Sequence, residues 1–263
     1  MGVVNVTPDS FSDGGRYLDP DAALAYARRL IADGADLLDI GGESTRPGAE
    51  PVGEAEEIER VVPVIEALAA ECAVPISIDT LKPAVARAAI AAGAGIWNDV
   101  TALGGSTDSL PLAAELGCTV VLMHMKGEPR TMQREPDYDD VVEEVLAFLS
   151  ERAGAAIAAG VTRDHIWLDP GIGFGKRLEH NLQLLRGLDR IVALGFPVVL
   201  GVSRKRFVRA IDPSAVEASD RLGGSLAAAL WGAHQGAAML RVHDVRETVQ
   251  ALRVWRAIQE ARP

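Results

Sequence analysis

The chain has 263 residues, which is long enough for one large domain or two smaller ones. Hydrophobic residues make up 48% and charged residues 24%, which predicts a folded protein with a large core and excludes a disordered chain. The net charge of −11 and the lack of any basic run argue against nucleic acid or an anionic membrane as a partner. A small anionic substrate is compatible with this charge, because a few converging cations set the local field.

Nothing in the chain indicates export or a membrane location. Its longest apolar runs are far shorter than the roughly 20 residues that a spanning helix needs. No charged leader with a cleavage site precedes the first apolar run, so a secretion signal is not expected. The two cysteines, Cys72 and Cys118, suggest no disulfide framework and fit a reducing compartment. We therefore expect a cytoplasmic protein.

Short β-rich apolar runs alternate with longer helical stretches from the first residues to the last. The eight predicted strands cover residues 2–6, 37–41, 75–79, 95–99, 118–124, 165–169, 197–201 and 238–242. The first two predicted helices cover residues 20–33 and 53–71, and a later one begins near Tyr138. Glycine follows several predicted helices, where it favours the left-handed conformation that ends a helix. These glycines are Gly34, Gly93, Gly117, Gly195 and Gly236.

Eight consecutive strand–helix units predict a single α/β domain, a closed (β/α)8 TIM barrel that spans residues 1–263. Such barrels are typically about 250 residues long, and closure leaves no edge strand exposed. The alternative is a doubly wound open sheet, which shows the same alternation of strands and helices.

Polar and charged side chains fall at the ends of nearly all the predicted strands. In a TIM barrel the active site lies at these C-terminal strand ends and in the loops that follow them. A single Asp or Asn at such a place is more often a helix cap or a turn residue, but a whole ring of them indicates a site. The ring comprises Asn5, Asp39, Asp79, Asn98, Asp99, Asp169, Ser203, Arg204, Lys205, Arg241 and His243.

Other common kinds of site are not supported by the sequence. The glycine-rich stretch 169–176 (DPGIGFGK) is not a Walker loop, because Pro170 and Arg177 replace residues that the motif requires. The chain has no Cys/His cluster with zinc-binding spacing and no Gly-x-Ser-x-Gly elbow of a serine hydrolase.

Eight stretches of the sequence, in order, resemble the dihydropteroate synthase family. They are 5–15 (NVTPDSFSDGG), 39–48 (DIGGESTRPG), 77–80 (SIDT), 98–100 (NDV), 124–127 (HMKG), 169–176 (DPGIGFGK), 201–205 (GVSRK) and 241–245 (RVHDV). The resemblance covers essentially the whole chain, and the first two motifs are long and specific. The family usually has a short segment before the first strand, whereas here that strand begins at the first residues.

The resemblance implies that 6-hydroxymethyl-7,8-dihydropterin pyrophosphate is condensed with 4-aminobenzoate to give 7,8-dihydropteroate and pyrophosphate. It implies that the edge of the pterin ring is bound by Asp79, Asn98 and Asp169 together with the cation of Lys205. These are the donor and acceptor groups that the pterin edge requires.

The resemblance also assigns residues to the pyrophosphate group. Asn5, Arg241 and His243 are expected to hold it, with Asn5 as the protein ligand of a Mg2+ that bridges phosphate oxygens. For His243 the alternative is a cap on the last helix.

The 4-aminobenzoate pocket is expected under the first two loops. Its residues would be Phe11, Thr45, Arg46, Pro47, Phe174 and Ser203. The mechanism implied is dissociative, with Asp13 stabilising a pterin-methyl cation, and the catalytic residues are Asp13, Lys205, Arg241 and His243. The family also suggests a homodimer that associates through the late helices.

Two other functions are compatible with a pterin-binding barrel. One is a methyltransferase domain that would pass a methyl group to a corrinoid partner, but such a domain would lack the first two long motifs. The other is a protein that binds pterin without turnover, which the complete set of polar residues argues against. Fold alone does not separate these functions.

Overall fold

The described part of the chain forms a closed barrel of eight parallel strands. The computed structural model describes residues 1–7, 20–44, 51–127, 131–132 and 136–261. The strands are β1 (Gly2–Asn5), β2 (Leu38–Gly41), β3 (Ile76–Asp79), β4 (Ile96–Asp99), β5 (Thr119–Met123), β6 (Ile166–Asp169), β7 (Val199–Gly201) and β8 (Met239–Arg241). Each strand begins and ends within two residues of its predicted range, so the strand predictions are confirmed.

Hydrogen bonds between strands close the barrel and exclude the open sheet. Strands β1 to β6 pair in sequence order, and β7 pairs with β8. A parallel bridge between Leu168 and Val198 joins β6 to the β7 side, and another between Gly2 and Val242 joins β8 to β1. The amide of Val3 donates to the carbonyl of Val242 at 3.0 Å across this second seam. The predicted (β/α)8 barrel is therefore confirmed.

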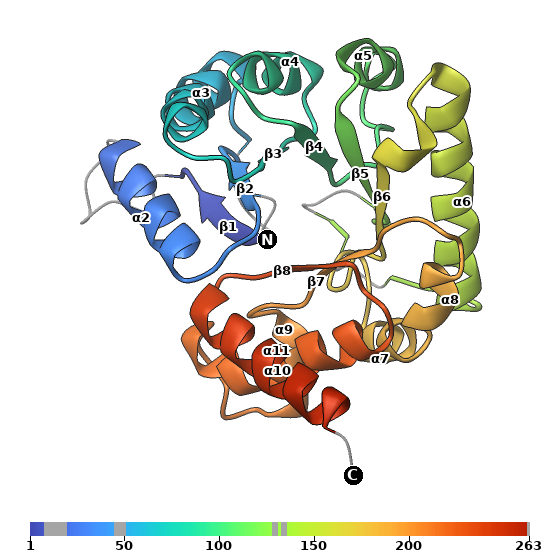
Figure 1. The fold of residues 1–263 in the computed structure, drawn as a ribbon. Coiled ribbons are helices and arrows are strands. Elements are labelled where there is room, and N and C mark those ends of the chain that lie inside the picture. Colours follow the sequence, from blue (N-terminus) through green and yellow to red (C-terminus); the bar gives the residue numbers. More distant parts are fainter. Residues whose placement is uncertain (8–19, 45–50, 128–130, 133–135, 262–263) are drawn as a thin grey trace.

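The helices form an outer ring around the strands, as Figure 1 shows. They are α2 (Pro20–Ala32), α3 (Glu54–Glu71), α4 (Pro83–Ala91), α5 (Ser109–Leu116), α6 (Val141–Ala159), α7 (Leu178–Arg186), α8 (Leu188–Val192), α9 (Arg206–Ile211), α10 (Leu222–His234) and α11 (Val245–Glu260). Two helices, α9 and α10, lie between β7 and β8, which the simple alternation did not predict. None of the helices within the described ranges is long and apolar enough to cross a membrane.

The ends of the helices follow from local sequence. All five glycines predicted at helix ends have positive φ, from 61° at Gly117 to 118° at Gly93. At the start of α6, the Asp140 carboxylate accepts hydrogen bonds from the amides of Val142 and Glu143 at 3.0 and 3.1 Å. This is a standard N-cap, which satisfies amides that the helix itself leaves unpaired.

The apolar core has two separate parts because strand side chains alternate between the two faces of the barrel wall. Outward-facing residues such as Ile40, Leu122, Leu168 and Leu200 are fully buried against the helices. Inward-facing residues form a smaller layer inside the barrel. This layer consists of Met1, Leu37, Ile96, Val121 and Val199, with Trp167 and Met239 packed against it.

The inner apolar layer is the floor of the barrel mouth. Two residues further along the same strands stand Asp39 after Leu37, Asn98 after Ile96, Asp169 after Trp167 and Arg241 after Met239. A step of two residues keeps a side chain on the same face, so these four polar side chains share the interior with the apolar layer. The sequence thereby places a ring of polar side chains next to the apolar layer, on the side of the barrel mouth.

The loop after β6 packs so closely on the end of β5 that it requires glycine. A Cβ on Gly171, where φ is 67°, would lie 1.9 Å from the carbonyl oxygen of His124. A Cβ on Gly175 would lie 2.2 Å from the carbonyl oxygen of Lys126. Both distances are far below van der Waals contact, so backbone would have to move to admit any side chain.

A matched pair of glycine substitutions would separate this close packing from the cost of a positive φ. A Cβ on Gly117, where φ is 61°, would meet no atom within 4 Å, in contrast to one on Gly171. We expect Gly117→Ala to lower the free energy of unfolding by about 1–2 kcal/mol, the cost of a left-handed residue. Gly171→Ala should cost a further ~1–3 kcal/mol through the clash. Urea unfolding would measure both, and equal losses would contradict the packing explanation.

Candidate active site

At the mouth of the barrel, one guanidinium is shared by two carboxylates, one fully buried and one partly buried. Nε of Arg241, at the end of β8, donates to Oδ2 of Asp39 at 2.6 Å, and its Nη2 donates to Oδ2 of Asp79 at 2.7 Å. The Asp39 side chain is fully buried, and those of Asp79 and Arg241 are 15% and 21% exposed. Charge-assisted bonds of this kind contribute about 1.5–3 kcal/mol each. The arrangement fixes Arg241 across three strands.

The amide of Asn98 extends this network on β4. Its Nδ2 lies 3.3 and 3.4 Å from the two carboxylate oxygens of Asp39. On the other side, Asn5 of β1 is in register with Gly41 of β2, which is in register with Asp79. A Cβ on Gly41 would lie 3.8 Å from Oδ2 of Asp79, so this glycine keeps side-chain atoms away from that carboxylate.

A second group of opposite charges lies between β6 and β7. Oδ1 of Asp169 accepts from the amide of Gly171 at 2.7 Å. The ammonium of Lys205 donates to the carbonyl of Ile172 and lies 4.7 Å from the centre of the Phe174 ring. A Cβ on Gly201 would lie 3.6 Å from Nζ of Lys205 and 4.0 Å from Oδ2 of Asp169. Gly201 therefore leaves room for both charged groups at this point.

Burial controls the ionisation of these groups. Burial raises the pKa of Asp79 to about 7, against the opposing charge of Arg241, and the nearby carboxylate of Asp39 adds to the rise. Burial lowers the pKa of Lys205 to about 8, although Asp169 opposes this shift. Burial also raises the pKa of Asp169, against the charge of Lys205. Two of these groups thus titrate near neutral pH.

His243, which follows β8, bonds to Ser203, which follows β7. Nδ1 of His243 and Oγ of Ser203 are 3.0 Å apart, and the same hydroxyl accepts from the His243 amide at 3.2 Å. The N-cap residue of α11 is Asp244, so the alternative interpretation of His243 as the helix cap is wrong. Ser203 itself is buried, and its hydroxyl orients the imidazole.

A buried lysine holds the glycine-rich loop from below. Nζ of Lys176 donates to the carbonyls of Gly171, Phe174 and His124 at 2.9, 3.0 and 3.2 Å, and lies 2.9 Å from Nδ1 of His124. Burial, together with the charge of Lys176, lowers the pKa of His124 to about 3, so this imidazole is neutral at pH 7. Lys176 and Lys205 thus both donate to backbone carbonyls of the same loop.

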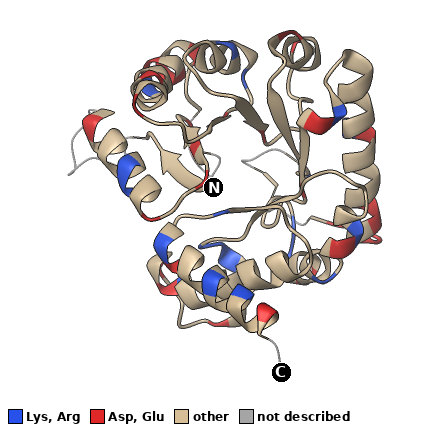
Figure 2. Ribbon diagram, in the orientation of Figure 1, with Lys and Arg blue, Asp and Glu red and all other residues tan. Residues whose placement is uncertain are grey.

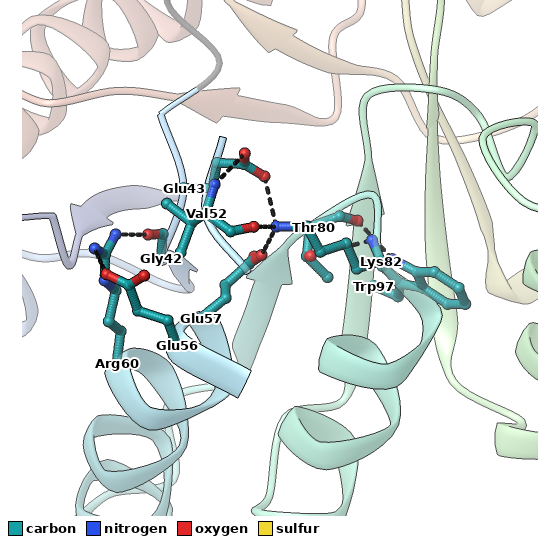
Figure 3. A network of polar contacts seen from close by, with 9 residues as sticks. All are labelled: Gly42, Glu43, Val52, Glu56, Glu57, Arg60, Thr80, Lys82 and Trp97. Atoms are coloured by element: carbon teal, nitrogen blue, oxygen red, sulfur yellow. Dashed lines mark hydrogen bonds and ion pairs between the residues drawn. The ribbon is translucent and has the colours of Figure 1, made fainter. Parts of the chain in front are cut away.

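The loop after β2 is tied down at both of its described ends by Lys82, which follows β3 (Figure 3). Nζ of Lys82 donates to Glu43 at 2.9 Å, to Glu57 of α3 at 2.5 Å and to the carbonyl of Val52 at 2.7 Å. The Glu43 carboxylate in turn accepts from the Val52 amide at 3.0 Å. These bonds connect the loop to helix α3 and to the strand that carries Asp79.

The structure brings most of the predicted site residues together. Asp79, Asn98, Asp169, Lys205 and Arg241 stand on strand ends or just beyond them around one mouth. The remaining described members of the predicted set are Asn5, Phe174, Ser203 and His243. The predicted residues Phe11, Asp13, Thr45, Arg46 and Pro47 lie outside the described residues.

Two features were missed as site components by sequence reasoning. Asp39 was noted at a strand end but given no role, although it contacts both Arg241 and Asn98. Asp39 lies two residues after the inward-facing Leu37, so its side chain must also point into the barrel, and this spacing could have identified it. The contact between Lys176 and His124 could not have been found this way, because it depends on the path of a loop.

Metal ligands are sparse at the described part of the mouth. No group of three or more His, Cys, Asp or Glu residues suited to a metal ion occurs within the described ranges. Asn5 is half-buried at the end of β1 and offers one amide oxygen. One protein oxygen supplemented by phosphate oxygens and water fits the coordination that Mg2+ prefers, and it does not fit a protein cage for zinc or calcium.

Fold and site together define a barrel enzyme whose C-terminal mouth presents paired carboxylates and cations to a polar ligand. The pterin binding enzyme family model matches residues 1–243. A dihydropteroate synthase of Streptococcus pyogenes is 48% identical over 97% of this chain and 93% of its own length.

Solved structures agree in fold and in sequence. Xanthomonas albilineans dihydropteroate synthase with 4-aminobenzoic acid matches with a TM-score of 0.93 and 53% identity, over 100% of this chain and 93% of the other. The same enzyme in complex with 7,8-dihydropteroate gives a TM-score of 0.90 and 50% identity, over 100% of this chain and 94% of the other. The chain belongs to the dihydropteroate synthases within the pterin binding enzyme family. These matches favour a condensing enzyme over the methyltransferase alternative.

Proposed function

We propose that the chain condenses 6-hydroxymethyl-7,8-dihydropterin pyrophosphate with 4-aminobenzoate, releasing pyrophosphate and giving 7,8-dihydropteroate. The C–O bond to the pyrophosphate breaks, and the bond from the methylene carbon to the aryl nitrogen forms with loss of one proton. The observation that carries the proposal is the ring of buried and partly buried opposite charges at the mouth, formed by Asp39, Asp79 and Asp169 with Lys205 and Arg241. The relatives named above bear the same activity in their names.

In this proposal the pterin ring lies along the side of the mouth between β3 and β7. Carboxylates of Asp79 and Asp169 accept from the amino and ring N–H groups, and the Asn98 amide serves both as donor and acceptor. Lys205 donates to the ring carbonyl. Its ammonium already donates to a carbonyl oxygen, that of Ile172, so an incoming carbonyl would find the donor in place.

The pyrophosphate is proposed to lie over Asn5, Arg241 and His243. Arg241 is held by two carboxylates and so is oriented before the ligand arrives. Bound Mg2+, with Asn5 as its protein ligand, would neutralise charge on the departing phosphate oxygens. Mg2+ dependence and a cytoplasmic location belong to this proposal.

The 4-aminobenzoate pocket is proposed to involve Phe174 and Ser203 together with residues of the first two loops. Those loop residues, Phe11, Thr45, Arg46 and Pro47, lie outside the described part of the chain. The Phe174 ring contacts Lys205 and would form one wall of this pocket beside the pterin. Ser203 would act mainly through His243, since its hydroxyl is bonded to that residue.

A turnover assay tests the function, and its pH dependence tests the assigned groups. In the free enzyme Asp79 is anionic above its pKa of about 7, and Lys205 is protonated below its pKa of about 8. If both charged forms are needed, kcat/KM for the pterin substrate should fall below the first value and above the second. Lys205→Arg should abolish the alkaline fall, because arginine stays protonated. No product from the wild type would reject the function, and an unchanged alkaline fall in the variant would reject the role of Lys205.

The order of bond changes is proposed to be dissociative, with the C–O bond breaking first. An aryl amine is a weak nucleophile, whereas fixed charges in a dry mouth stabilise a developing cation strongly. Asp13, which lies outside the described residues, is the proposed stabiliser. Deuterium at the pterin methylene should then give a large normal secondary isotope effect on the chemical step. A value near one, measured where chemistry limits the rate, would indicate direct displacement.

A homodimer is proposed through α7, α10 and α11. These helices carry large apolar side chains that are well exposed, from 43% for Leu182 to 67% for Ile258, with Trp231 and Val254 between them. The Trp231 ring is fixed, because its Nε1 donates to the carbonyl of Leu185 at 2.7 Å.

Oligomeric state tests this surface directly. Trp231→Arg should shift the protein from dimer to monomer in sedimentation velocity, because a charge would be buried at the interface. The matched control is Ile157→Arg on α6, another exposed apolar position, at 41% exposed. A wild type that sediments as a monomer, or equal behaviour of the two variants, would contradict the proposed surface.

A further inference from the structure

Arg204 has a strained backbone at the point where the chain turns between two site residues. Its φ is 60°, and it is one of three non-glycine residues with positive φ in the described ranges. It stands between Ser203, which bonds to His243, and Lys205, which lies beside Asp169. A left-handed residue other than glycine persists only where surrounding contacts hold it, and such residues cluster at functional sites.

Every polar group of Arg204 described by the structure has a partner. Its guanidinium makes two bonds to the carboxylate of Asp244, Nε to Oδ2 at 3.0 Å and Nη2 to Oδ1 at 2.5 Å. Its amide donates to the hydroxyl of Ser225 at 2.8 Å, and its carbonyl accepts from Nη1 of Arg221 at 3.0 Å. The turn is therefore held from α10 and from the loop after β8.

The side chain of Asp244 bonds to Arg204 and makes no cap bond to its own helix. It is the N-cap residue of α11, and aspartate at that position commonly accepts from the first amides of the helix. Here its side chain makes no cap bond and is turned to Arg204 instead. A left-handed arginine and an aspartate that makes no cap bond thus meet at one contact.

The contact runs parallel to the one between Ser203 and His243. Two consecutive residues after β7, Ser203 and Arg204, bond to two consecutive residues after β8, His243 and Asp244. The next residue, Lys205, has its ammonium near Asp169, since a Cβ on Gly201 would lie 3.6 Å from Nζ of Lys205 and 4.0 Å from Oδ2 of Asp169.

We propose that Arg204 and Asp244 form a positioning pair that fixes Lys205 relative to His243. The inference rests on the proposed function, in which Lys205 binds the pterin ring and His243 binds the pyrophosphate. A ligand that carries both parts needs the two loops at one fixed separation. A ligand that carries only the pterin ring or only the pyrophosphate does not need this fixed separation, because it contacts only one of the two loops. The pair therefore controls how well the two halves of the site act together.

One variant removes the pair, a second weakens it, and both are expected to spare the fold. Arg204→Gly removes the guanidinium, and glycine adopts the left-handed conformation without strain. Asp244→Asn removes the charge, and asparagine is an equally good helix N-cap. The matched control is Arg87→Ala. It breaks an exposed ion pair in which Arg87 of α4 makes two hydrogen bonds to the carboxylate of Glu115 of α5.

Calorimetry with three ligands tests the inference: the pterin pyrophosphate, the 6-hydroxymethyl pterin alone and inorganic pyrophosphate alone. Both variants should lose about tenfold in affinity for the joined ligand, because linked binding depends on the separation of the two subsites. Affinity for each separate part should change by no more than about twofold, since each subsite is intact. The double variant should lose no more than Arg204→Gly alone, because that variant already removes the whole contact. Arg87→Ala should match the wild type for all three ligands.

The outcomes separate positioning from a structural role. Losses of similar size for the joined ligand and for the separate parts, or a large fall in the urea midpoint of both variants, would overturn the inference in favour of a structural pair. Unchanged affinity of both variants for the joined ligand would overturn it as well. A wild type that fails to bind pterin pyrophosphate would overturn the proposed function and this inference with it, whereas binding that both variants retain overturns the inference alone.

Discussion

The mouth of the barrel depends on one guanidinium held between two carboxylates. Arg241 bonds to Asp39 and Asp79, which belong to two neighbouring strands on the far side of the seam that closes the barrel. Breaking a buried pair from one side typically costs about 3–5 kcal/mol, because the remaining charge is left unpaired. The three residues therefore orient one another. They also join the end of β8 to the ends of β2 and β3 by side-chain bonds. The cation is ordered before any ligand binds.

The dry floor beneath this ring makes the charges effective. The apolar layer that includes Leu37, Ile96 and Val121 fills the barrel interior, so the polar ring has protein rather than water below it. Burial shifts the pKa of Asp79 upward and that of Lys205 downward, toward neutral pH. The same burial strengthens each hydrogen bond to a ligand. Strand alternation produces both layers from a single pattern of apolar and polar residues.

The sequence predicted the barrel well because its signals are local. Strand ends, glycine turns and the parity of side chains depend on neighbours within a few residues, and all eight strands lay where these signals put them. The members of the polar ring followed from the same strand ends. The contacts of Lys82, Lys176 and Arg204 could not be predicted, since each joins loops that are distant in sequence. The presence of two helices between β7 and β8 was not predicted, because the first of them, α9, has only six residues and no side-chain cap.

The charge balance of the ring bears on how a strongly anionic substrate binds to a protein of net charge −11. In Figure 2 acidic and basic positions both occur along the outer helices. Within the mouth, the carboxylates Asp39, Asp79 and Asp169 oppose the cations Lys205 and Arg241, and Lys176 is bonded to backbone carbonyls below. The described ring therefore holds no surplus of positive charge for a pyrophosphate. An additional cation that arrives with the substrate would supply it, which is the physical reason to expect Mg2+ in the proposed reaction.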